Sequence, residues 1–84
     1  MNKATIKSIA VEAAGDLVRK GEYDDAPMIT AYQDSDGSVT VKFFEAGEGH
    51  KARQAARAAL KAAGYRITYD HRNDARVGVI EVAA

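Results

Sequence analysis

Apolar residues recur along this chain of 84 residues with two different periods, one typical of helices and one typical of strands. In residues 3–20 they return at spacings of three and four, the period of a helix with one buried face. Asn2 precedes this segment as an N-cap, and Gly21 follows it as a left-handed C-terminal cap. The apolar positions are Ile6, Ile9, Ala10, Ala13 and Leu17. The pattern predicts a first helix over residues 3–20.

A second helical pattern covers residues 50–63 and ends before Gly64. Its apolar stripe consists almost entirely of alanine, with Leu60 beside it, which allows close approach to a sheet. The opposite side spans a sector about 100° wide. We call this sector the basic helix face; its members are His50, Arg53, Gln54, Arg57 and Lys61. No acidic residue lies between His50 and Ala63.

Four runs are typical of strands, and two of them, residues 39–44 and 65–69, alternate with a period of two. Residues 28–33 and 39–44 flank a turn-forming cluster at 34–38, and they predict a first hairpin. Residues 65–69 and 77–82 flank a turn at 71–74 and predict a second hairpin. In the second run, Val39, Val41 and Phe43 fit a buried side, whereas Thr40, Lys42 and Phe44 fit the opposite side.

The resulting order is αββαββ, which predicts an α+β two-layer sandwich in one domain, 1–84. We expect a four-stranded sheet with both helices on one face. Moving the last strand to the front gives βαββαβ, so one candidate is a circularly permuted ferredoxin-like plait. That topology makes the second and fourth strands central and leaves Pro27, Arg66 and Asp70 on the edge strands. The alternatives are a meander with strand order 1-2-3-4 and a mixed two-layer variant.

Composition narrows the classes of function. Hydrophobic residues make up 46% of the chain and charged residues 29%, as in a globular protein. There is no cysteine, and nothing resembles a signal peptide or a membrane span, so we expect a soluble cytoplasmic protein. Net charge is zero, but residues 1–50 carry an excess of four negative charges and residues 51–84 an excess of four positive charges. Zero net charge argues against strong non-specific binding of nucleic acid.

No motif for catalysis, metal or cofactor is present. His50 and His71 are 21 positions apart and belong to no metal-ligand spacing. The serines lack a nucleophile-elbow motif or an obvious base. The Gly47-Glu48-Gly49 segment lacks the lysine and serine of a phosphate-binding loop. We therefore expect neither enzymatic activity nor a bound metal or cofactor.

Three regions remain as candidate partner-binding surfaces. The first is the basic helix face, which suits phosphates or an acidic protein; the alternative is an ordinary solvated helix surface. The second is the side of the sheet that carries Lys42 and Phe44, with members of the set Tyr32, Tyr65 and Tyr69 nearby. The alternative is that these aromatic residues cap the core or cover an edge of the sheet. The third is the acidic loop around Asp24 and Asp25.

These features favour a small non-enzymatic interaction module, an adaptor or inhibitor that binds a larger protein or nucleoprotein. Inhibitors made by phages and mobile elements, such as anti-CRISPR proteins, share this size and lack of catalytic residues. That analogy rests on no residue motif. The alternative is a nucleic-acid-binding domain that uses the basic helix face together with the neighbouring Arg66 or Arg72. A homodimer formed through the sheet is a further possibility.

Overall fold

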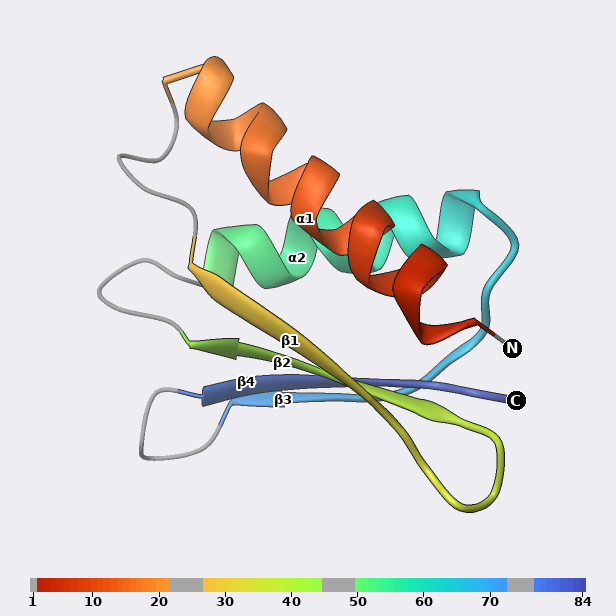
Figure 1. The fold of residues 1–84 in the computed structure, drawn as a ribbon. Coiled ribbons are helices and arrows are strands. Elements are labelled where there is room, and N and C mark those ends of the chain that lie inside the picture. Colours follow the sequence, from red (N-terminus) through yellow and green to blue (C-terminus); the bar gives the residue numbers. More distant parts are fainter. Residues whose placement is uncertain (1, 22–26, 45–49, 73–76) are drawn as a thin grey trace.

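The computed structural model describes residues 2–21, 27–44, 50–72 and 77–84, and it has the αββαββ order expected from the sequence (Figure 1). The helices and strands, in chain order, are α1 (Lys3–Arg19), β1 (Met28–Gln33), β2 (Val39–Phe44), α2 (His50–Ala62), β3 (Ile67–Arg72) and β4 (Val77–Val82). Both helices end within one residue of their predicted limits. Three of the four strands have the predicted bounds.

Local hydrogen bonds explain why the first helix begins and ends where it does. The Asn2 side chain accepts from the backbone N–H groups of Ala4 and Thr5, at 2.9 and 3.3 Å. These groups have no partner inside the helix, so the cap satisfies two of them. At the other end Gly21 has a φ of +75°, and its N–H donates to the carbonyl of Val18. The predicted left-handed glycine cap is confirmed. Gly64, predicted to close the second helix, is also left-handed, with a φ of +94°.

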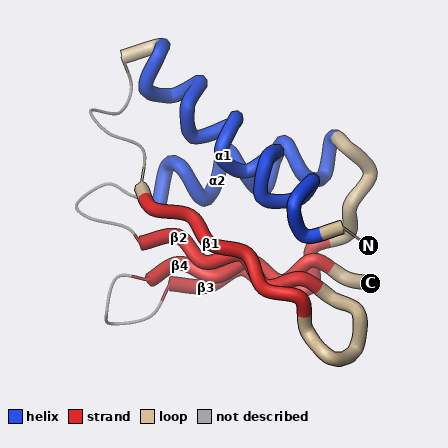
Figure 2. The backbone as a smooth tube through the Cα atoms, in the orientation of Figure 1, coloured by secondary structure: helices blue, strands red, loops and turns tan. Residues whose placement is uncertain are grey.

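The four strands form one antiparallel sheet in the order β1-β2-β4-β3. Both helices lie on one face, and no described element covers the other (Figures 1 and 2). β2 and β4 are central and β1 and β3 are edges, as in the permuted ferredoxin-like arrangement. The simple meander is excluded, because β4 lies between β2 and β3.

The core fills the space between the helices and the covered face of the sheet. Val39, Val41 and Phe43 are fully buried, as the alternation predicts. They meet Ile80 and Val82 of the neighbouring β4. From the helix layer, small side chains allow close packing of α1, α2 and the sheet. The buried helix residues are Ile6, Ala10, Ala13, Ala14, Ala52, Ala56 and Leu60.

β3 departs from the predicted second hairpin. The strand begins at Ile67 and continues to Arg72. His71 pairs with Val79 and Arg72 pairs with Gly78, so both residues belong to the strand. The prediction that the turn begins at residue 71 is therefore wrong. Residues 73 and 74 lie outside the described residues. The register shifts between Ile67 and Tyr69, so one extra residue interrupts the alternation, as in a β-bulge. The side chains after the bulge therefore change sides.

Among the described residues, neither helix combines the length and the apolar character needed to cross a bilayer.

Candidate interaction surfaces

Two arginines of the basic helix face converge on one carboxylate of β3. Arg53 Nε donates to Asp70 Oδ1 at 2.8 Å, and Arg57 Nη1 donates to Asp70 Oδ2 at 2.9 Å. The Arg53 and Asp70 side chains are only 12% and 16% exposed, whereas Arg57 is 45% exposed. Each carboxylate oxygen thus accepts from a different guanidinium, and this charge-assisted cluster ties α2 to β3.

The cluster changes the electrostatics of the basic helix face. Asp70 supplies a negative charge to a sector in which the helix sequence contains none. The other members lie outside these contacts: Gln54 and Lys61 are exposed, and His50 is half-buried at the first residue of α2. The surface that an approaching phosphate meets is therefore less positive than the helix sequence indicates.

Sequence reasoning noted Asp70 only as a charge on an edge strand and missed its contact with the arginines. The separations of 17 and 13 residues give no local indication of the pairing. The bulge turns Asp70 toward the arginines. Ile67 pairs with Val82 and Asp70 pairs with Ile80, so both side chains face the helices. In a regular strand, two residues three positions apart would face opposite sides. An inward-facing charge on an edge strand also discourages pairing with another strand.

The uncovered side of the sheet is the second surface. We call it the outer sheet face, and strand register assigns its members: Met28, Thr30, Tyr32, Thr40, Lys42, Phe44, Tyr69, His71, Val77, Val79 and Glu81. The structure places Lys42 and Phe44 there, as the alternation predicts. Tyr32 and Tyr69 join them, whereas Tyr65 packs against the core instead.

Large exposed apolar side chains concentrate on this face. Five are found among the described residues, and four of them belong to the outer sheet face: Met28, Tyr32, Phe44 and Tyr69. The fifth, Val11, is on α1. Phe44 pairs with Met28 on one side and with Val77 on the other, so these residues form a continuous apolar row across three strands. Contiguous exposed apolar surface of this kind typically marks an interaction site.

The middle of the outer sheet face carries a cation, and its far end carries acids. The Lys42 Nζ lies 5.2 Å from the centroid of the Tyr32 ring, within cation–π distance. The Thr40 hydroxyl bridges the carboxylates of Asp34 and Glu81. Hydrogen bonds from Thr40 and from Ser38 hold the pKa of the Asp34 carboxyl below its usual value. The face thus runs from an apolar row, past one lysine, to an acidic end.

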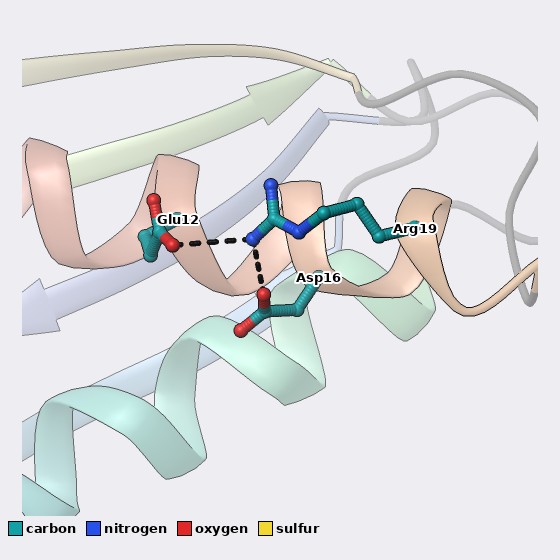
Figure 3. A network of polar contacts seen from close by, with 3 residues as sticks. All are labelled: Glu12, Asp16 and Arg19. Carbon is teal, nitrogen blue, oxygen red and sulfur yellow. Dashed lines mark hydrogen bonds and ion pairs between the residues drawn. The ribbon is translucent and has the colours of Figure 1, made fainter.

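A shallow groove of about 420 Å³ lies on the helix layer between α1 and α2. Its polar lining includes Glu12 and Asp16, and Arg19 binds both carboxylates (Figure 3). Arg19 offsets one of the two negative charges, so the three residues keep one net negative charge. The described residues contain no group of three or more histidine, cysteine or acidic side chains placed to hold a metal ion.

The candidate residues from the sequence therefore separate into groups that do not meet. Lys42 and Phe44 lie on the outer sheet face, whereas the basic helix face lies in the helix layer on the opposite side of the sheet. Asp24 and Asp25 lie outside the described residues. The candidate residues that the structure describes therefore form two separate surfaces and no composite site.

Comparison with known proteins adds no functional constraint: no protein-family model, no curated protein and no solved structure matches this chain.

Proposed function

We propose that this protein is a non-enzymatic interaction module, an adaptor or inhibitor, that docks a larger protein through its outer sheet face. A cytoplasmic location is part of the same proposal. The observation that carries it is the concentration of four of the five large exposed apolar side chains on this one face. Burial of such surface is the main driving force of protein association.

The chemistry of the face favours a protein partner over a nucleic acid. Aromatic residues on an open sheet are able to stack bases, but Asp34 and Glu81 would repel a phosphate backbone at the acidic end. On the other side of the molecule, Asp70 offsets one of the two positive charges of Arg53 and Arg57. The nucleic-acid alternative therefore has weaker support on both surfaces.

A pair of matched substitutions tests the proposal. Phe44 and Val11 are almost equally exposed, at 44% and 47%, but Phe44 lies on the outer sheet face and Val11 lies on α1. Tagged wild-type protein, Phe44→Glu and Val11→Glu are used to capture partners from a lysate of the source cells, and bound proteins are quantified by mass spectrometry. We expect a partner that wild type and Val11→Glu retain and that Phe44→Glu loses by at least tenfold.

Circular dichroism and thermal unfolding establish that each variant is folded before capture is compared. Equal loss of a partner in both variants would show a general effect of added charge. Loss in Val11→Glu alone would move the docking surface to the helix layer. Either result would contradict docking through the outer sheet face.

A further inference from the structure

The central cation of the outer sheet face limits what is able to cover it. Within the described part of the chain, Lys42 makes no ion pair, and its ammonium contacts only the ring of Tyr32. A purely apolar partner would remove Lys42 and Glu81 from water, and these two residues make no ion pair with each other in the described structure, so the cover would be costly. A surface that places a carboxylate near Lys42 and a cation near Glu81 avoids this cost.

A second copy of the same face meets both requirements. Lys42 pairs with Val79, and Thr40 pairs with Glu81, so Lys42 and Glu81 are diagonal neighbours on the two central strands. A two-fold axis parallel to the strands, between β2 and β4, lays β2 of one copy over β4 of the other. Phe44 then lies opposite Val77 of the second copy. Lys42 lies opposite Val79, with Glu81 two residues farther along the same strand. Sheets stacked about 10 Å apart leave this carboxylate within reach of a lysine side chain.

We infer that, when no partner protein is bound, the outer sheet face is covered by a second copy of this chain, with reciprocal Lys42–Glu81 ion pairs across a two-fold axis. This inference rests on the proposed function, because it assigns the occupant of the same face in the unbound protein. Self-association and docking of the larger partner are then mutually exclusive. Dissociation of the homodimer becomes a step that precedes docking.

The size of the face sets the strength of the dimer. Four strands of six residues cover a plane of about 20 by 20 Å, which is small for a stable protein interface. We therefore expect a weak dimer with a dissociation constant on the order of 10–1000 µM. Sedimentation velocity from about 10 µM to about 1 mM covers this range. The average mass of wild type should rise from one chain toward two.

Charge reversal distinguishes this arrangement from other dimers. In Lys42→Glu, position 42 of each copy repels Glu81 of the other, and in Glu81→Lys, position 81 repels Lys42. Each single variant should lose self-association at least tenfold. An equimolar mixture of the two should form a mixed dimer, because both ion pairs become attractive again. Lys61→Glu, on the exposed side of α2, is the matched control and should dimerise like wild type.

Chemical shifts provide a second measurement that requires no variant. Dilution of wild type should move the amide resonances of Phe44, Val79 and Tyr69, and leave those of α1 unchanged. Wild type that stays monomeric at about 1 mM would overturn the inference. Dimers unaffected by Lys42→Glu, mixtures that stay monomeric, or shifts confined to the edge strands would overturn it as well.

The inference and the proposed function fail in different ways. If wild type is monomeric but Phe44→Glu selectively loses a larger partner, docking through the outer sheet face stands and self-association is wrong. If the charge-reversal pattern is found but partner capture is equal in Phe44→Glu and Val11→Glu, the dimer stands and the docking proposal is wrong.

Discussion

The basic helix face and the outer sheet face differ in what the rest of the chain places against them. Arg53 and Arg57, the most conspicuous cations in the helix sequence, are bound by Asp70 from β3. Phe44, which the alternation in the sequence places on the opposite side of β2 from the core, is 44% exposed, and no described element covers that face of the sheet. The basic helix face is the easier of the two surfaces to recognise in the sequence. In the fold, however, a carboxylate already binds two of its arginines, whereas the outer sheet face is left uncovered. A surface is available to a partner only when the fold leaves its chemistry unsatisfied.

The largest expected contrast is between two neighbours on β2. Phe43 is fully buried against the helices, whereas Phe44 is on the outer sheet face. Phe43→Ala should lower the free energy of unfolding by about 3–5 kcal/mol, through lost burial and a cavity. Phe44→Ala removes cross-strand contacts with Met28 and Val77 and should lower it by about 1 kcal/mol. Urea unfolding followed by circular dichroism measures both values. A large loss in Phe44→Ala would mean that this side chain serves the fold.

Removal of the Asp70 carboxylate should have the next largest effect. Asp70→Ala removes the acceptor for Arg53 and Arg57 in a largely buried position, and a loss of about 2 kcal/mol is expected. Asp70→Asn keeps the shape and one acceptor, so its loss should be smaller. The same urea titrations provide the comparison. If Asp70→Ala and Asp70→Asn are both as stable as wild type, the cluster does not stabilise the fold. The basic helix face would then again be a candidate binding surface.

Salt dependence of DNA binding tests that surface directly. With Asp70 in place, the exposed cations of α2 are Arg57 and Lys61. Contacts from these two give a slope of log K against log salt no steeper than about −2. Fluorescence anisotropy with a mixed-sequence duplex, at about 0.05–0.2 M salt, measures the slope. Asp70→Asn should raise affinity by a few-fold, because one negative charge is removed. A wild-type slope of about −4 or steeper would show that more cations of this surface contact DNA than Arg57 and Lys61, and would contradict the view that Asp70 limits its charge.

The smallest effect is expected at the acidic end of the outer sheet face. The Thr40 and Ser38 hydroxyls lower the pKa of Asp34, and the Ser38 hydroxyl and backbone N–H lower the pKa of Asp36. Because both carboxyls have lower pKa values in the folded than in the unfolded state, they stabilise the fold above about pH 4. This contribution is lost as the pH falls through their folded pKa values.

The variant Ser38→Ala removes hydroxyl contacts from both carboxylates. Its unfolding free energy should therefore fall less steeply than that of wild type between about pH 4 and pH 2. Thermal unfolding at a series of pH values measures the two acid limbs. If the free energies of unfolding of wild type and Ser38→Ala fall in parallel with pH, the Ser38 hydrogen bonds do not lower the pKa values of Asp34 and Asp36 in the folded state. Gln33→Ala, in the same hairpin but without a titrating group, serves as the control.

Local patterns in the sequence were sufficient for most of the secondary structure. Helix period, the Asn2 cap and the terminal glycines predicted both helices, because caps and periodic burial act between residues close in the chain. Alternation in residues 39–44 placed Phe43 inside and Phe44 outside for the same reason. The bounds and the facing of β3 could not be predicted in this way, because a register shift that depends on pairing with β4 interrupts its alternation.

By itself, the sequence determined the αββαββ order, the inward side of β2 and the presence of a cationic sector on the second helix. Only the tertiary structure decided that β4 lies between β2 and β3, that Asp70 turns toward α2, and that Tyr69 shares the outer sheet face with Phe44. The reason is physical. Periodicity and capping are contacts within a few residues, whereas strand order, bulge register and ion pairing join residues that are distant in the chain and meet only in the packed fold.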